Sequence, residues 1–164
     1  MAAPTIEKAQ FVRDLPDLAA TEALAAVVAA LLRPRDVVAL SGELGSGKTT
    51  FARALIGAVA ERRHVAREEV PSPTFTLVQV YEFPALPVWH FDLYRLKRPD
   101  EAFELGIEDA FANAVSLIEW PERLGSLLPP ERLDIRFEFV EGDKREARVA
   151  GSGTWAERMG ALRG

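Results

Sequence analysis

The chain has 164 residues, of which 48% are hydrophobic and 27% are charged. A chain of this size can bury a hydrophobic core, and we expect residues 1–164 to form a single domain. The formal net charge of −5 lacks the basic excess that is typical of proteins binding nucleic acid or anionic lipid over a whole face. The absence of cysteine excludes disulfides and thiolate metal sites.

The beginning of the sequence, MAAPTIEKAQFVRDLPD, does not follow the charged and then apolar pattern of a signal peptide. No window approaches the roughly 20 apolar residues that span a bilayer. We therefore expect a cytoplasmic protein without a membrane segment.

The first predicted element is a helix that Asp17 caps and that ends before Pro34. Its apolar residues recur with helical spacing, which predicts one buried stripe. The stripe consists of Leu24, Val27, Val28, Leu31 and Leu32.

A short apolar strand is predicted next, over residues 36–40, because the segment DVVAL is apolar and leads directly into a glycine-rich loop. The sequence TTFARALIGAVAE, residues 49–61, predicts a helix after the loop. The predicted order is therefore strand, loop, helix.

Three more strands and one helix are predicted in the middle of the chain. The strands cover residues 74–83, 88–94 and 115–120, and prolines interrupt the chain between the first two. A helix is predicted to begin at Pro99 and to stop at Gly106.

The last predicted feature is a hairpin of residues 133–140 and 145–151, because LDIRFEFV alternates apolar and polar residues and is followed by a turn. Strands and helices interleave in the first part of the chain, and antiparallel pairing appears late. The sequence therefore predicts an α/β fold with a mainly parallel central sheet, antiparallel additions and flanking helices. Residues 42–49, GELGSGKT, carry the phosphate-loop pattern G-x-x-x-x-G-K-[ST] between the first of these strands and its helix, so the predicted fold is of the P-loop NTPase type.

The loop Gly42–Thr49 matches the phosphate-binding pattern G-x-x-x-x-G-K-[ST] and lies between a predicted strand and a predicted helix, as that pattern requires. Glycines allow the backbone N–H groups to turn inward toward a triphosphate. Lys48 provides a charge for the β and γ phosphates, and the Thr49 hydroxyl is suited to bind Mg²⁺.

Magnesium needs further oxygen ligands, which are expected at the ends of buried strands. Asp92 and Glu119 both follow apolar runs and are the two candidates. His90 alternates with apolar neighbours, which favours packing in the sheet over a catalytic role. The stiff segment Pro71–Glu82 is either an ordinary turn or a switch that senses the γ phosphate.

Six segments, in this order, resemble the bacterial TsaE family, formerly called YjeE. They are SGELGSGKTT, SPTFTLVQVYE, HFDLYRL, EAFELGIEDAF, IEWPERLGSLLP and REARV, and the resemblance extends from about Leu15 to Val149. It implies a small Mg²⁺-dependent ATPase that works with TsaB and TsaD, after TsaC has made threonylcarbamoyl-adenylate. This machinery places threonylcarbamoyl on the adenosine beside the tRNA anticodon, and TsaE itself does not perform the transfer. Any contact of the chain with tRNA is then expected to be made through the complex.

The resemblance also implies roles for individual residues. The phosphates of ATP are expected to be bound by Leu44, Gly45, Ser46, Gly47, Lys48, Thr49 and Thr50. Thr49 and Glu119 are expected to hold Mg²⁺, and Asp92 resembles a catalytic or metal-supporting carboxylate. Ser46 stands where alanine is common in the family.

Three further residues receive roles only through the resemblance. Thr74 resembles a switch threonine that takes part in catalysis with Lys48 and Asp92. Leu18, through its backbone, and Arg145 are expected to contact adenine.

Three other functions remain open at this point. A small-molecule or nucleotide kinase would share the loop, but no clear lid insertion separates the predicted strands. A guanine-nucleotide switch would carry an Asn-Lys-x-Asp segment, whereas Asn113 is the only asparagine in the chain. A binding module that uses ATP only as a scaffold has no distinguishing sequence feature.

Overall fold

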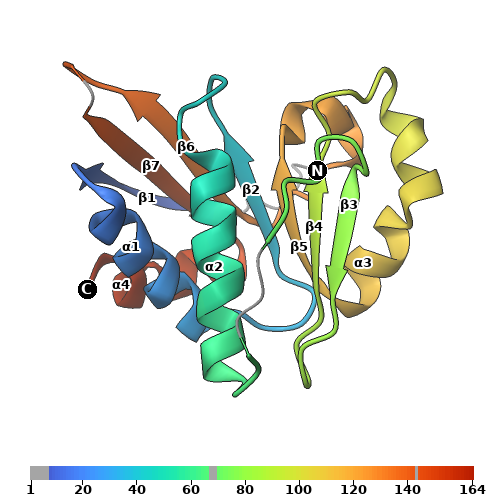
Figure 1. The fold of residues 1–164 in the computed structure, drawn as a ribbon, viewed down its shortest axis with the longest axis horizontal. Coiled ribbons are helices and arrows are strands. Elements are labelled where there is room, and N and C mark those ends of the chain that lie inside the picture. The colour runs from blue at the N-terminus through green and yellow to red at the C-terminus, as the bar shows by residue number, and fades with distance from the viewer. Residues whose placement is uncertain (1–7, 67–69, 143) are drawn as a thin grey trace, which may run out of the picture.

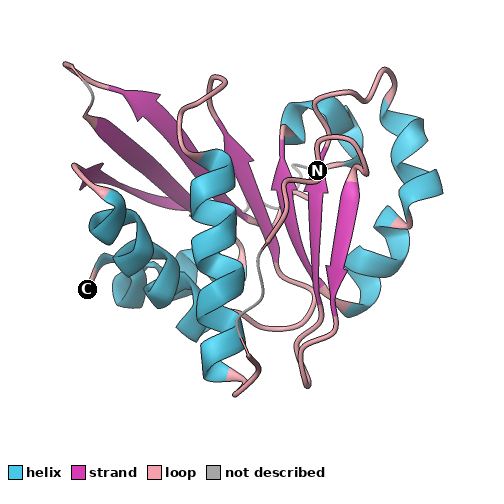
Figure 2. Ribbon diagram, viewed as in Figure 1, coloured by secondary structure: helices cyan, strands magenta, loops and turns pink. Residues whose placement is uncertain are grey.

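The structure is a computed structural model that describes residues 8–66, 70–142 and 144–164. It contains a seven-stranded sheet with the strand order β1-β7-β6-β2-β5-β4-β3. Helices cover both faces of this sheet (Figures 1 and 2).

The elements alternate between strands and helices along most of the chain. The strands are β1 (Lys8–Leu15), β2 (Val37–Ser41), β3 (Val78–Tyr81), β4 (Val88–Asp92), β5 (Val115–Glu119), β6 (Leu133–Phe139) and β7 (Arg145–Ser152). The α-helices are α1 (Leu18–Leu31), α2 (Lys48–Arg62), α3 (Ile107–Asn113) and α4 (Thr154–Arg163), and the 3₁₀ helices are η1 (Pro99–Leu105) and η2 (Pro121–Leu127).

The centre of the sheet is parallel. Strands β6, β2, β5 and β4 run in the same direction, whereas β7 pairs antiparallel with both β6 and β1, and β3 pairs antiparallel with β4. The arrows of β2, β5 and β4 accordingly point to one edge of the sheet, at the top of Figure 1. The predicted fold class is confirmed, and this edge is where parallel sheets form ligand sites.

The two faces of the sheet are covered differently. One face packs against α1, α2 and α4, and Figure 1 shows α2 in front of the middle of the sheet with α1 and α4 beside it. On the other face, η1, α3 and η2 pack against β2, β5 and β4, and Val78 of β3 also contacts this cluster. Beyond them that face is polar, and exposed Arg148 pairs there with Glu138 at 3.0 Å.

The predicted first helix forms as expected. The Asp17 side chain accepts a hydrogen bond from the Ala20 backbone N–H at 2.8 Å, which satisfies one of the unpaired donors of the first turn. Leu24 and Val28 are fully buried, and Val27 is only half-buried. The buried stripe is therefore centred closer to Ala25 and Ala29 than the large side chains alone indicate.

The predicted strand over residues 74–83 is too long. Only Val78–Tyr81 forms a strand, and the preceding residues form a turn in which Leu77 has a φ of 70°. The turn is closed by the Leu77 N–H, which donates to the Pro73 carbonyl at 2.6 Å. Thr74 therefore lies in a turn and not in a strand.

The predicted hairpin of residues 133–140 and 145–151 is confirmed by the pairing of β6 with β7. The helix predicted from Pro99 is a 3₁₀ helix that ends at Gly106, whose φ is 82°. Within the described ranges, no helix is both long and apolar enough to cross a bilayer.

Candidate functional site

The loop between β2 and α2 is shaped by glycines in conformations that other residues rarely adopt. Gly42, Gly45 and Gly47 have φ angles of 134°, 76° and 118°. A Cβ on Gly42 would lie 2.5 Å from the carbonyl oxygen of Phe137, so the loop packs closely on β6. Gly47 caps α2 without a side-chain hydrogen bond, which leaves the first amides of the helix available to an anion.

Lys48 is the buried cation of this loop. Its Nζ donates to the carbonyl oxygens of Gly42 and Glu43 at 2.6 and 2.8 Å, and it lies 4.3 Å from the centre of the Trp120 ring. Burial lowers the pKa of Lys48, although the negative charge of Glu119 opposes the shift. An anion bound at the loop would favour the charged form of this side chain.

Thr49 is brought into contact with a buried acid on the neighbouring strand. Its Oγ1 donates to Oε1 of Glu119, the last residue of β5, at 2.7 Å. The other carboxylate oxygen, Oε2, lies 2.7 Å from Nε2 of His90 on β4. His90 is fully buried, as its alternation with apolar neighbours predicts, and it is also a partner of the acid.

Asp92 ends β4 beside Glu119, its register partner on β5. Its Oδ2 accepts a hydrogen bond from Thr74 Oγ1 at 2.9 Å, and its Oδ1 accepts one from the Tyr94 backbone N–H at 3.1 Å. The hydroxyls of Ser72 and Thr74 lie 2.8 Å apart. The turn before β3 is thus tied to the edge of the sheet through Asp92.

These side chains fit Mg²⁺ that is bound together with phosphate. No three His, Asp or Glu side chains of the described residues form a group that would hold a metal ion without other ligands. The hydroxyl of Thr49 and a carboxylate oxygen of Glu119 are hard oxygen donors, and they lie 2.7 Å apart. Mg²⁺ typically takes one or two protein ligands of this kind and completes its shell with water and phosphate oxygens.

Arg145 lies beside the loop, as a nucleotide contact requires. Its Cδ is 3.9 Å from the position of a Cβ on Gly47, and its guanidinium carbon is 5.5 Å from the centre of the Phe139 ring. Arg145 begins β7 and pairs there with Leu15, the last residue of β1. Leu18 begins α1 directly after this strand and is exposed, so the chain brings both predicted adenine contacts to neighbouring element ends.

The remaining loop residues differ in their surroundings. Leu44 and Thr50 are exposed, whereas Ser46 is fully buried. The Ser46 Oγ has no hydrogen-bond partner among the described residues. It lies 2.6 Å from the position of a Cβ on Gly42, beneath the loop and not on its outer surface.

Trp120 is a site residue that the sequence does not identify. It adopts a left-handed backbone conformation with a φ of 59°. Its ring contacts the ammonium group of Lys48 and also the ring of Tyr94, and the centres of the Trp120 and Tyr94 rings are 5.0 Å apart. A left-handed conformation is rare for a bulky residue and is often found at functional sites. The available signal was its position directly after Glu119.

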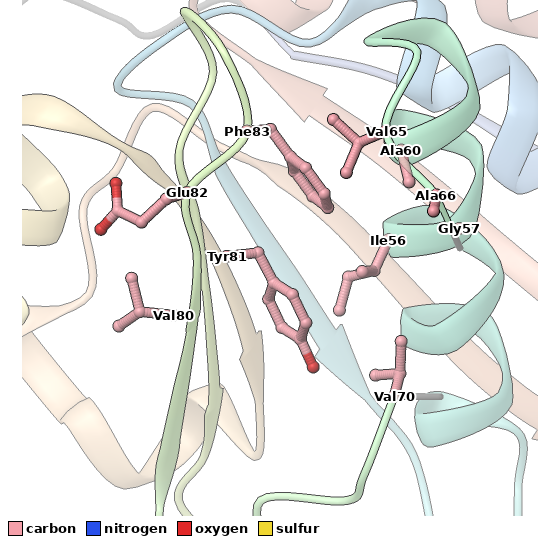
Figure 3. A pocket seen from close by; sticks show the side chains of 10 residues that line it. All are labelled: Ile56, Gly57, Ala60, Val65, Ala66, Val70, Val80, Tyr81, Glu82 and Phe83. Carbon is pink, nitrogen blue, oxygen red and sulfur yellow. The ribbon is translucent and has the colours of Figure 1, made fainter. Parts of the chain in front are cut away.

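A separate apolar cavity of about 210 Å³ lies between α2 and β3. Figure 3 shows Ile56 and Val70 on one side of it, facing the rings of Tyr81 and Phe83 on the other. Ile56 lies about two helical turns from Lys48 along α2. No lysine or arginine of the described residues lines this cavity, so it does not suit a phosphate.

Comparison with known proteins identifies the family of this chain. The model of the family "Threonylcarbamoyl adenosine biosynthesis protein TsaE" matches residues 15–147. A protein of Rickettsia felis named tRNA threonylcarbamoyladenosine biosynthesis protein TsaE is 41% identical over 127 residues, which cover 76% of this chain and 71% of that protein. The protein of the same name from Bacillus subtilis is 38% identical over 140 residues, covering 85% of this chain and 84% of its own length.

A solved structure extends the similarity to the fold. The crystal structure of YdiB from Bacillus subtilis superposes with a TM-score of 0.74 and 29% sequence identity, covering 98% of this chain and 97% of that one. The family match covers the loop, both strand-end acids and Arg145. The chain therefore belongs to the TsaE family of threonylcarbamoyl adenosine biosynthesis proteins.

Proposed function

We propose that this protein is a Mg²⁺-dependent ATPase of the machinery that makes N6-threonylcarbamoyladenosine in tRNA, and that it acts with TsaB and TsaD. The observation that carries the proposal is the contact between Thr49, at the start of α2, and Glu119, at the end of β5. It joins a phosphate loop to a buried acid at the sheet edge where ligands bind. The relatives named above supply the pathway.

In this proposal the loop binds the phosphates of ATP. The backbone N–H groups between Leu44 and Thr50 surround the anion, and Lys48 exchanges its two carbonyl partners for phosphate oxygens. Charge-assisted hydrogen bonds to phosphate are stronger than bonds to neutral carbonyls, which favours the exchange. The Trp120 ring, whose centre lies 4.3 Å from the Lys48 ammonium nitrogen, helps to keep that charge in place.

Thr49 and Glu119 would hold Mg²⁺, which neutralises the phosphate charge that develops during hydrolysis. Asp92 lies next to Glu119 and would orient or deprotonate the attacking water. Its carboxylate keeps a defined direction because the Thr74 hydroxyl and the Tyr94 N–H each donate to one of its oxygens.

Adenine is the base that we propose, bound near Arg145 and the backbone at Leu18. A planar guanidinium can stack on a base and also donate hydrogen bonds to it. The position of Arg145 beside Gly47, where the phosphates begin, is consistent with this role.

Hydrolysis would serve a partner and not a second substrate of this chain. The turn that contains Thr74 carries Phe75, whose side chain is 78% exposed and lies under the guanidinium of Arg95 at 4.2 Å. A large exposed aromatic residue next to a nucleotide site suits a protein contact. Because Thr74 binds Asp92, a change at the γ phosphate can alter the exposed surface of this turn.

The proposal takes residues 1–164 as one ATPase domain that works in the cytoplasm together with the tRNA modification machinery. All seven strands of the described residues, from β1 near the beginning to β7 just before α4, belong to one sheet, which supports the single domain. Contact with tRNA is assigned to the complex, because the chain has a net charge of −5.

A reconstituted modification assay tests the proposal. With TsaC, TsaB, TsaD, tRNA and ATP, the protein should allow many rounds of modification, and TsaB–TsaD should raise its slow ATPase rate. A variant with Lys48→Ala should support neither effect. If multiple-turnover modification is equally fast without this chain and its ATPase rate is indifferent to the partners, a stand-alone kinase or hydrolase becomes the better assignment.

A further inference from the structure

We propose that His90 is a positioning residue, which holds the carboxylate of Glu119 in the orientation that receives Mg²⁺. The inference rests on the proposed Mg²⁺–ATP function and adds a residue to it. His90 does not touch the nucleotide or the metal in this proposal and acts through Glu119 alone.

The first argument is the placement of His90 beside the acid. His90 and Asp92 are two residues apart on β4, so their side chains lie on the same face of the sheet, and Asp92 is the register partner of Glu119 on β5. His90 Nε2 lies 2.7 Å from Glu119 Oε2, and both residues are buried. Such a short contact between buried polar groups is a strong hydrogen bond.

The second argument is that the two carboxylate oxygens of Glu119 have different partners. Oε1 accepts the hydroxyl proton of Thr49 from α2, and Oε2 faces His90 on β4. The carboxylate is therefore fixed by one partner on each side. When Thr49 and Glu119 turn their oxygens to a metal ion, the bond between their oxygens is lost and the His90 bond remains as the restraint on Glu119.

The third argument concerns the direction of the His90 hydrogen bond. A carboxylate only accepts hydrogen bonds, so the proton must be on Nε2. The other ring nitrogen, Nδ1, is buried without a hydrogen-bond partner among the described residues. With the proton on Nε2, the unpaired atom is only an acceptor, and no buried N–H is left without a partner.

A histidine that merely fills the core would not need this geometry. An apolar residue in its place would fill the volume as well, and the acid would then keep only the Thr49 contact. Residues that orient a metal ligand in this way typically change metal affinity by about 10- to 100-fold when they are replaced. The effect should appear in Mg²⁺ binding and not in binding of the nucleotide alone.

Two substitutions separate the roles. His90→Leu removes the donor and keeps an apolar side chain in the core. His90→Gln places an amide N–H at the same number of bonds from Cβ as Nε2 of histidine, so it can restore the bond to Glu119. Phe91→Leu is the matched control, because Phe91 is equally buried on the same strand but packs into the core of the opposite face.

The experiment measures the affinity of each folded variant for a non-hydrolysable ATP analogue by calorimetry, with EDTA and across a Mg²⁺ titration. We expect His90→Leu to bind the metal-free analogue within about 2-fold of the wild type and to require at least about 10-fold more Mg²⁺. His90→Gln should recover most of the Mg²⁺ dependence, and Phe91→Leu should retain it. If His90→Leu does not fold, His90→Asn, whose amide is one bond shorter, replaces it and should show the same loss.

Three outcomes would overturn the inference. An unchanged Mg²⁺ requirement in His90→Leu or His90→Asn would leave His90 as a core residue, while the proposed function stands. If His90→Leu loses affinity for the analogue equally with and without Mg²⁺, and His90→Gln does not recover it, His90 is likewise only a core residue. A wild-type protein whose nucleotide affinity ignores Mg²⁺ would instead overturn the proposed function, and the inference with it.

Discussion

The two ends of β2 each hold a buried cation, and the two cations are satisfied in opposite ways. At the amino end, Arg158 from α4 binds Asp36, with two hydrogen bonds of 2.8 Å between the guanidinium and the carboxylate. It also donates to Leu31 O at 2.8 Å and to Thr154 Oγ1 at 3.0 Å. The Trp155 ring covers it, with its centre 3.7 Å from the guanidinium carbon.

At the carboxyl end, Lys48 forms no ion pair with any carboxylate of the described residues. Its two hydrogen bonds go to carbonyl groups of its own loop, at 2.6 and 2.8 Å. The buried acid Glu119 is bound by the Thr49 hydroxyl instead. The cation and the acid are therefore both buried at this edge but are not paired with each other.

The difference explains which end of the sheet is a site. When a buried charged side chain has charged and polar partners for all its donors, its removal destabilises the fold, and no donor remains free to bind a ligand. A buried charge that is held only by neutral carbonyl groups gains when an anion arrives. Substitutions at the two ends should accordingly separate stability from binding.

The largest expected effect is on stability, from Arg158→Ala. Removing this side chain leaves Asp36 as a buried charge without its partner, which typically costs about 3–5 kcal/mol of the free energy of unfolding. The fraction that remains folded should bind nucleotide with wild-type affinity, because the change lies at the far end of β2. Urea unfolding and nucleotide titration measure the two quantities.

Arg148→Ala is the matched control for this experiment, since Arg148 is an exposed arginine that pairs with Glu138. Surface pairs of this kind contribute little, so its unfolding midpoint should stay close to that of the wild type. The comparison fails if Arg158→Ala is as stable as Arg148→Ala, or if it loses nucleotide binding while it is folded.

Lys48→Ala should show the reverse pattern. Hydrogen bonds to charged groups contribute about 1.5–3 kcal/mol each, so losing two of them to phosphate should weaken ATP binding by at least ~100-fold. The free energy of unfolding should not fall, because burial already disfavours the charged form of Lys48. Titration of ATP against this variant and against Lys97→Ala, at an exposed lysine, measures the difference. Wild-type affinity in Lys48→Ala would mean that the loop is only structural.

The sequence predicted the carboxyl end of β2 much better than the amino end. Gly42 and Lys48 belong to a sequence pattern that by itself predicts phosphate binding. The strand before this loop and the helix after it are predicted by local apolar runs. Asp92 and Glu119 follow the same logic, since acids that directly follow buried parallel strands meet at one edge.

The missed elements depend on contacts between distant parts of the chain. Strand β1 lies at the sheet edge and carries Arg13 and Val12, so its polar and apolar residues do not alternate in the usual way. Helix α4 buries Arg158 with Trp155 and Met159 at helical spacing, and an arginine in that stripe hides the pattern. Its burial is possible only because Asp36, far away in sequence, pairs with it.

The third prediction sharpens the assignment of the acid at the carboxyl end. Glu119→Gln keeps the size of the side chain but removes its charge, so Mg²⁺-dependent hydrolysis should fall by about 10- to 100-fold while metal-free nucleotide binding changes much less. Hydrolysis rates across a Mg²⁺ titration measure the shift, with Asp92→Asn as the comparison. Unchanged metal dependence in Glu119→Gln would transfer the metal-binding role to Asp92.

The smallest expected effect comes from Thr74→Val, which removes one hydroxyl and conserves the shape of the side chain. The hydroxyl donates to Asp92 at 2.9 Å, so its loss should free one oxygen of that acid and loosen the turn before β3. We expect the partner-stimulated hydrolysis rate to fall by about 5- to 10-fold, which corresponds to the roughly 1 kcal/mol of one hydrogen bond. Nucleotide affinity should stay unchanged, because Thr74 contacts Asp92 at the end of β4 and is not part of the phosphate loop.

Thr76→Val is the matched control, since Thr76 is in the same turn but its hydroxyl accepts a hydrogen bond from Gln79 at 3.1 Å. ATPase rates with and without TsaB–TsaD separate the two variants. Equal losses in both would attribute the effect to the turn as a whole. If Thr74→Val hydrolyses ATP more slowly than the wild type alone but equally fast with TsaB–TsaD, a switch that couples Thr74 to docking is contradicted. The partners would then restore the geometry without the Asp92 contact that is proposed to transmit it.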